Sequence, residues 1–365
     1  MMDLLRKIKI NEDALRRAEE RLISVWNYED VDFLPIIVDT PTPNDWPRFS
    51  YHEEFYDMRK MLINQLAQVY VHSKIEDDAM LTIRPNYGVG IIPSAFGCEI
   101  IVKGDNMPWV KPILSDIDDV YKLKVPDMHV SGLCGKVLKT INFYKDILRK
   151  SGLDKYVHIY LADTQGPLDI AFLLRGVRFY KDIFTNRKEI HRLLDIATDA
   201  YIKFSKIMKD VIGEPYGEGY HRMIRMSKGG VRICEDVAVN LSPKAYVEFS
   251  KPYNERAFKQ FNGGYIHFCG KGHHILKYVV KTKGIKGLDL GNPEYYNLRE
   301  LMELLSKHKV CLIGWPIRWN AKDGFLKSAK ELLKRIDLKT GIILRTYAPS
   351  IDHARRIVRK WRSLF

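Results

Sequence analysis

The sequence has few cysteines and no long apolar run. Its five cysteines include no Cys-x-x-Cys pair, and so sparse and odd a set in 365 residues is typical of reduced thiols. No stretch approaches the roughly 18 apolar residues of a membrane span, and residues 1–7 lack the apolar core of a secretory signal. These absences predict a cytoplasmic protein that does not enter a membrane.

The sequence also lacks the short motifs of several enzyme classes. No Gly-x-Ser-x-Gly turn occurs and no Gly-x-Gly-x-x-Gly follows an apolar run, which argues against a serine hydrolase and a dinucleotide enzyme. Gly270-Lys271 is similar to the end of a phosphate loop. However, Tyr265 stands where the first glycine belongs, and no Ser or Thr follows Lys271.

Basic residues exceed acidic ones, giving a formal charge of +14. They are spread along the chain, and the densest run, 355–362, places Ile357, Val358 and Trp361 on one face of a helix. That pattern indicates a solvated amphipathic helix, and no nucleic-acid recognition motif accompanies it. We therefore expect no nucleic-acid partner, whereas an anionic substrate or an acidic protein partner remains open.

Eight short apolar runs alternate with helical patterns and predict a (β/α)8 barrel with an N-terminal helical extension over about residues 1–30. Most of these runs lack strict alternation, as expected of strands covered on both faces. The expected strands are 33–38, 81–86, 157–163, 231–236, 264–269, 285–290, 309–315 and 341–346. Segment 98–103 competes with 81–86 for the second place. Since no linker or repeat occurs, one domain over 1–365 is expected.

Polar residues stand where these strands end, which is where barrel enzymes place their chemistry. They are Asp39, Asn86, Asp163 with Gln165, Glu235 with Asp236, His267 with Cys269, Asp289 with Asn292, Trp315, and Tyr347. Any single one is explained as a buried, hydrogen-bonded group. Their recurrence at nearly every strand end favours an active site.

The sharpest local pattern is His267-Phe268-Cys269-Gly270. Residues two apart in a strand project to the same face, so the imidazole and the thiol are placed to share a zinc ion. From spacing alone, a buried cysteine beside a hydrogen-bonded histidine is the more common explanation of such a pair. His273 and His274 follow, either as further ligands or as the first turn of a helix.

Four blocks together resemble the uroporphyrinogen decarboxylase superfamily across roughly residues 80 to 350. They are Pro93-Ser94-Ala95-Phe96-Gly97, the segment from Gly166-Pro167 to Gly176, the segment from Asp236 through Leu241-Ser242-Pro243 to Pro252-Tyr253, and His267-Phe268-Cys269-Gly270. The last block is similar to the His-x-Cys-Gly of the corrinoid-dependent methyltransferase branch. Gly88 stands where true decarboxylases carry an essential aspartate, and Phe172 stands in place of their substrate-site tyrosine. The resemblance is therefore closer to the methyltransferases.

This resemblance implies that a methyl group moves between a small methylated substrate or a thiol and a corrinoid carried by a partner protein, with zinc assistance. His267 and Cys269 match two zinc ligands of that branch, but its eighth-strand cysteine is replaced here by Thr346-Tyr347-Ala348. Asp289 is the first candidate to complete the site. Glu294, His273 and Cys311 are the others.

The remaining strand-end residues are assigned roles on the same basis. Asp163, Asp236 and Tyr347 are the expected acid–base residues, and Arg84, Asn86, Tyr87 and Gln165 are expected to bind substrate. Two alternatives remain open. One is a decarboxylase or other lyase of the superfamily acting on another acidic substrate, and the other is a non-catalytic binding barrel.

Overall fold

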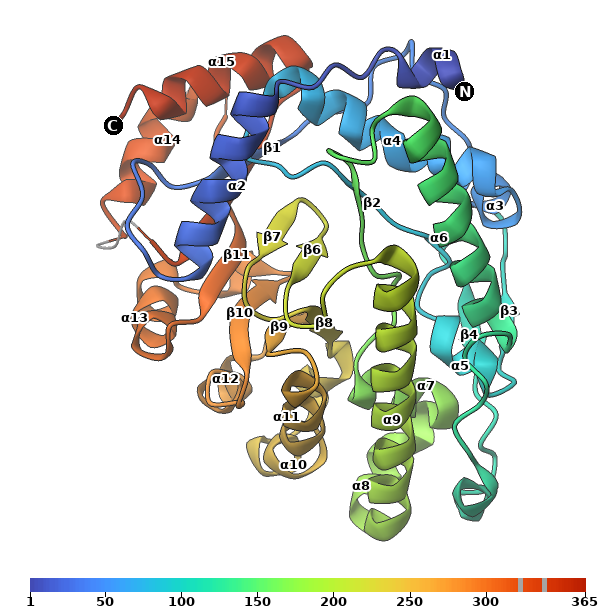
Figure 1. Ribbon diagram of the computed structural model, residues 1–365. Coiled ribbons are helices and arrows are strands. Elements are labelled where there is room, and N and C mark those ends of the chain that lie inside the picture. Colours follow the sequence, from blue (N-terminus) through green and yellow to red (C-terminus); the bar gives the residue numbers. More distant parts are fainter. Residues whose placement is uncertain (321–323, 337–339) are drawn as a thin grey trace.

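A computed structural model describes residues 1–320, 324–336 and 340–365. Eight parallel strands alternate with helices around one barrel (Figure 1). The strands are β1 (Ile36–Asp39), β2 (Thr82–Ile83), β5 (His158–Ile159), β8 (Val231–Cys234), β9 (Gly264–Phe268), β10 (Ile285–Leu290), β11 (Cys311–Pro316) and β12 (Ile342–Tyr347). The predicted barrel is confirmed, and α1 (Met2–Leu5) and α2 (Glu12–Trp26) form its N-terminal extension.

The helices form the outer ring of the barrel (Figure 1). Within the described ranges they are α3 (Tyr51–Tyr56), α4 (Met58–Ile75), α5 (Ile91–Ala95), α6 (Gly132–Ser151), α7 (Pro167–Arg175), α8 (Phe179–Thr185), α9 (Arg187–Ile212), α10 (Pro243–Phe249), α11 (Lys251–Lys259), α12 (His273–Val279), α13 (Leu298–His308), α14 (Gly324–Leu333) and α15 (Ile351–Arg362). None of them is long and apolar enough to cross a bilayer. The competing segment 98–103 forms β3 (Glu99–Ile101), which pairs with β4 (Trp109–Lys111) outside the barrel sheet, so 81–86 was the correct choice.

Backbone pairing does not close the whole wall. Six strands form one sheet in the order β1-β12-β11-β10-β9-β8, while β2 and β5 pair only with each other. At the seam between β1 and β2, aspartate side chains accept the backbone N–H groups of β1 that a paired strand would otherwise accept. Asp78 accepts the Ile36 N–H at 2.9 Å and Asp77 accepts the Val38 N–H at 2.7 Å.

The second seam lies between β5 and β8. Here Asp163, which follows β5, pairs with Arg232 of β8 at 3.2 Å. Gly166 brings the two backbones together, because a Cβ at this position would lie 2.6 Å from the Cys234 carbonyl oxygen. Both seams therefore depend on carboxylates and on close backbone contact.

A hairpin that the sequence analysis did not predict lies in the middle of the ring (Figure 1). Its strands are β6 (Gly219–His221) and β7 (Ile224–Met226). Ile224 and Met226 are buried in an apolar cluster with Trp26, Tyr265 and Cys311. This cluster fills the lower part of the barrel, at the level where the strands begin. Cys311, a candidate zinc ligand from the sequence, is fully buried in it.

The β1 seam provides a test of stability. Burial raises the pKa of Asp78 to about 6, so above that pH the ionised carboxylate pairs with the buried Arg21 guanidinium at 2.5 Å. We expect Asp78→Ala to lower the free energy of unfolding by about 2 kcal/mol, because it leaves the Ile36 N–H without its acceptor and the buried Arg21 guanidinium with the more exposed Asp32 as its remaining carboxylate partner. Urea denaturation at pH 8 measures this. The matched control is Asp13→Ala in an exposed pair, which should change it by less than about 1 kcal/mol; equal effects would contradict the role of the seam.

Candidate active site

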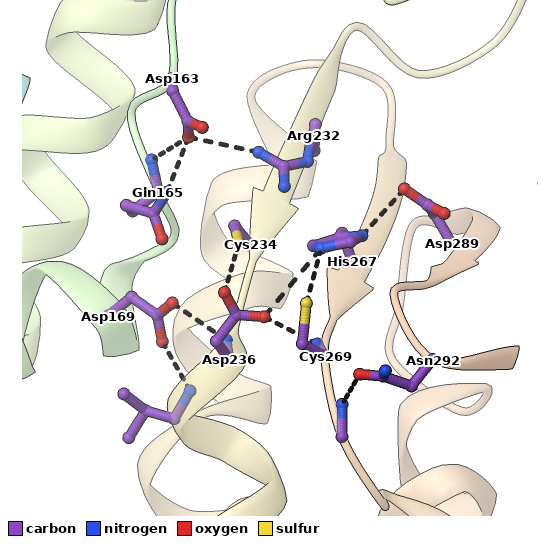
Figure 2. A network of polar contacts seen from close by, with 12 residues as sticks. Asp163, Gln165, Asp169, Arg232, Cys234, Asp236, His267, Cys269, Asp289 and Asn292 are labelled. Carbon is purple, nitrogen blue, oxygen red and sulfur yellow. Dashed lines mark hydrogen bonds and ion pairs between the residues drawn. The ribbon is translucent and has the colours of Figure 1, made fainter. Parts of the chain in front are cut away.

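In-register pairing of three strands creates a row of polar side chains. Cys234 of β8 is the partner of His267 of β9, and His267 is the partner of Asp289 of β10. Partners on neighbouring parallel strands project to the same face, and so do residues two positions further along. Asp236 and Cys269 therefore follow Cys234 and His267 one step nearer the barrel mouth. Figure 2 shows these residues facing one another.

Four donor atoms come together in this row, from Cys234, Asp236, His267 and Cys269. We call these residues the donor cluster. The Nε2 atom of His267 lies 3.6 Å from the Cys269 Sγ and 4.0 Å from the Asp236 Oδ1. The Cys234 Sγ lies 3.6 Å from the Asp236 Oδ2, and the ligand atoms of Cys234, Asp236 and His267 all lie within 4.8 Å of one another.

Asp289 lies behind the imidazole rather than among these donors. Its Oδ2 is 2.8 Å from the His267 Nδ1. The pKa of Asp289 is lowered: burial opposes this change, but the hydrogen bond from His267 and the surrounding positive charge, which includes Arg222 and Arg232, outweigh burial. An ionised carboxylate at Nδ1 places the ring proton there and leaves the Nε2 lone pair facing the cysteines (Figure 2).

Asp236 is fixed from two sides. The buried Asp169 carboxylate accepts the backbone N–H groups of Asp236 and Val237 at 2.9 and 3.1 Å. The Cys269 N–H donates to the Asp236 Oδ1 at 2.7 Å. Partial burial, together with the neighbouring Asp236 carboxylate, raises the pKa of Cys269 to about 11. Without a cation nearby, this thiol keeps its proton at neutral pH.

Asp163 belongs to a second polar group beside the donor cluster. It lies 3.5 Å from Arg84 and 3.2 Å from Arg232, and it accepts a 2.7 Å hydrogen bond from the Gln165 amide. Burial alone would raise the pKa of Asp163, but the two arginines lower it to about 2. The carboxylate is therefore ionised at neutral pH. It is placed to orient the Arg84 and Arg232 guanidinium groups rather than to donate a proton.

Three other predicted site residues lie away from the donor cluster. The Asn86 amide donates to Glu54 at 2.9 Å, and the fully buried Tyr87 bonds to Thr140 at 2.7 Å. Tyr347 is 57% exposed and lines a separate groove of about 530 Å³. The structure thus brings Asp236, His267 and Cys269 together, with Asp289, Asp163, Arg84 and Gln165 around them.

The other candidate ligands from the sequence are also engaged elsewhere. The Glu294 carboxylate pairs with Arg318 at 3.2 Å, and the His273 ring stacks on Tyr296 at 4.4 Å. Sequence reasoning missed Cys234 as a donor. Its signal was nevertheless present, because Cys234-x-Asp236 and His267-x-Cys269 are two same-face pairs at the ends of neighbouring strands.

A cavity of about 300 Å³ opens beside the donor cluster. His267 and Asp289 line it on one side, and Arg222, from the tip of the central hairpin, also contributes to its wall. Ile37, Ile313 and Ile343 are among its apolar lining residues. The volume is at the lower end of small-molecule sites in proteins.

Gly88 has no space for the aspartate of true decarboxylases. Its φ of +72° lies in the left-handed region, and a Cβ would approach the Pro108 Cδ to 2.9 Å. The decarboxylase aspartate therefore has no counterpart at this position.

Comparisons with known proteins also favour a likeness to methyltransferases over a likeness to true decarboxylases. Residues 67–211 match the Uroporphyrinogen decarboxylase (URO-D) family. The chain is 23% identical over 290 residues to the Methylcobamide:CoM methyltransferase MtbA of Methanosarcina acetivorans, covering 74% of this chain and 75% of the relative. A solved structure of a methyltransferase from Methanosarcina mazei superposes with a TM-score of 0.68 at 19% identity, covering 95% of this chain and 98% of the other, and shares its fold. The predicted resemblance is confirmed: the chain is similar to the uroporphyrinogen decarboxylase family over residues 67–211 and to a methylcobamide-dependent methyltransferase over most of its length.

Proposed function

We propose that this protein transfers a methyl group between a small methylated substrate or thiol and a corrinoid carried by a partner protein. The donor cluster beside a cavity of about 300 Å³ is the observation on which the proposal rests. The relative named as a methylcobamide-dependent enzyme supports a corrinoid as the second reactant. The five free cysteines support a cytoplasmic location, and we treat residues 1–365 as one barrel domain.

The donor cluster offers the thiol, imidazole and carboxylate donors that zinc takes in proteins, and the ligand atoms of Cys234, Asp236 and His267 lie within 4.8 Å of one another. Tetrahedral zinc with bonds of about 2.0–2.3 Å requires ligand atoms about 3.3–3.8 Å apart. The pairs His267–Cys269 and Cys234–Asp236 are each separated by 3.6 Å, and His267–Asp236 by 4.0 Å. We therefore propose that Cys234, His267 and Cys269 hold zinc, which leaves the fourth position of a tetrahedral ion for a substrate heteroatom and the Asp236 carboxylate beside it. Asp289 is proposed as a residue that orients His267 rather than as a ligand.

A bound zinc ion supplies Lewis acidity that converts a ligated thiol into a thiolate or polarises a substrate heteroatom. The side chains of the chain itself hold the reacting group in place. Asp289 fixes the His267 ring, and Asp169 fixes the backbone that presents Asp236. Asp236, whose side chain is 46% exposed, is the cluster carboxylate best placed to exchange a proton with a substrate at the mouth.

The reaction balances in either direction. The methyl group is transferred as a formal cation. The atom that gives up the methyl group keeps the electron pair of the broken bond, and the acceptor atom supplies the pair for the new bond. From methylcobamide to a thiolate, cobalt keeps the pair and sulfur provides the new one. The proposed residues create and orient the sulfur or oxygen partner in this exchange.

Metal content is the first test. Protein purified without chelators should contain about one zinc per chain by mass spectrometry, as expected for a tetrahedral site. Cys269→Ser and His267→Ala should lose most of it, because each removes a donor. Cys98→Ser, which removes a buried thiol outside the cluster, should retain it. Equal zinc in all four proteins would contradict the assigned ligands.

The role of Asp289 has its own test. Asp289→Asn keeps a hydrogen-bond acceptor but removes the charge behind His267, so we expect zinc affinity to fall by about 10- to 100-fold. Competition with a chromophoric chelator measures this affinity. The folded state should be unaffected by circular dichroism. Complete loss of zinc at saturating metal would instead make Asp289 a direct ligand.

Transfer itself can be followed by the absorbance of the corrinoid. With methylcobalamin and a panel of thiols, including coenzyme M, the wild type should demethylate the corrinoid. Cys269→Ser should slow this by about 100-fold or more, since it removes a proposed metal ligand, while Cys98→Ser should not. Unchanged turnover in Cys269→Ser would reject the thiolate role, and carbon dioxide release from an acidic substrate would favour the lyase alternative.

A further inference from the structure

The tip of the central hairpin places an arginine in the cavity beside the donor cluster. β6 and β7 are joined by two residues only, Arg222 and Met223, since His221 pairs directly with Ile224. Arg222 has a φ of +45°, at the first position of a two-residue connection where glycine is preferred. Holding a non-glycine residue there costs about 1 kcal/mol or more. Arg222 therefore occupies a position that glycine would fit better, and its side chain lines the cavity.

The hairpin is anchored firmly enough to position this side chain. The Met223 carbonyl accepts the Met80 N–H at 2.8 Å, and the Arg222 carbonyl accepts the Thr82 hydroxyl at 2.9 Å. Tyr220 stacks flat on His158, with ring centroids 3.7 Å apart. Two hydrogen bonds and one ring stack therefore fix the hairpin backbone around Arg222, while the Arg222 side chain is exposed and lines the cavity.

The other arginines of this region have carboxylate partners. The Arg345 guanidinium donates two hydrogen bonds to the Asp39 carboxylate, at 2.5 and 2.8 Å, and Arg318 pairs with Glu294 at 3.2 Å. Arg84 and Arg232 share the carboxylate of Asp163, and the Asp289 carboxylate, which is bonded to His267, interacts with Arg222 and Arg232 only at longer range. Among the residues that the structure describes, no acceptor lies within hydrogen-bonding or ion-pair distance of the Arg222 guanidinium.

We propose that Arg222 binds an anionic oxyacid group, a carboxylate or a sulfonate, on the small substrate that reacts at the donor cluster. The proposal rests on the proposed function for the identity of the reacting end, but not for the anion site. A guanidinium matches the planar or tripodal oxygens of such groups with paired hydrogen bonds. The substrate would lie across the cavity, with its acid group at the hairpin tip and its reacting end at His267, the residue of the donor cluster that lines this cavity.

Binding of unreactive analogues tests this without any methyl transfer. Propionate, ethanesulfonate and neutral propionamide are titrated into wild-type protein and followed by ligand-observed NMR. We expect at least one anion to bind at least tenfold more tightly than propionamide, and the two anions distinguish a carboxylate from a sulfonate site. Arg222→Gln and Arg222→Gly should abolish the preference. Lys228→Gln, which removes an exposed charge from the segment after the hairpin, should keep it.

The thermal stability of the Arg222 variants shows whether a loss of anion binding comes from the missing side chain or from a folding defect. Arg222→Gly removes the backbone strain, so its thermal midpoint should equal or exceed that of the wild type while anion binding is lost. No anion preference in the wild type, a preference that survives in both Arg222 variants, or equal loss in Lys228→Gln would overturn the proposal. A preference that depends on Arg222, in a protein that transfers no methyl group, would support the anion site and reject only the proposed reaction.

Discussion

In-register pairing of β8, β9 and β10 is the constraint on which the site depends. It aligns Cys234, His267 and Asp289 across three strands, and the two-residue period then adds Asp236 and Cys269 on the same face. A slip of β9 by one residue would turn His267 and Cys269 towards the helices and leave Asp289 without its imidazole. The hydrogen bonds that hold the barrel wall and the geometry of the donor cluster therefore have the same origin. Asp289 holds the His267 ring and Asp169 holds the backbone of Asp236, so each of these carboxylates positions one residue of the row.

Side chains close the barrel wall at the two places where strands do not pair, between β1 and β2 and between β5 and β8. Because β2 and β5 each have only two residues in the wall, Asp77, Asp78 and Asp163 make the connections that longer strands would make through the backbone. The central hairpin fills the space below with Ile224 and Met226. The open volume lies against this hairpin, with Ile224 among its lining residues. A residue that belongs to no barrel strand, Arg222, then lines the same cavity as His267.

Sequence periodicity was sufficient for the barrel and for half of the site. Buried parallel strands leave apolar runs that can be counted, and a His-x-Cys pair at a strand end must share one face. What the sequence could not supply were relations between strands. Cys234 is the last residue of an apolar run, so only the register with β9 identifies it as a donor. Asn86 and Tyr87 follow a strand that ends at Ile83, and their side chains bond to Glu54 and Thr140 instead of facing the mouth. The side of the imidazole on which Asp289 lies is likewise a property of packing.

The absence of an eighth-strand cysteine has a structural consequence beyond the count of ligands. With the proposed donors confined to the ends of β8 and β9, the wall formed by β11 and β12 contributes no metal ligand. That wall instead presents Ile313, Ile343 and the Asp39-paired Arg345 to the cavity. A substrate held against β8 and β9 would then extend across an apolar surface towards cationic side chains. A donor on β12 would have drawn the reacting group to the barrel axis and occupied this path. The absence of that cysteine and the presence of an arginine at the hairpin tip are thus compatible features of one cavity, in which the proposed zinc ligand His267 and the proposed anion-binding residue Arg222 line different parts of the wall.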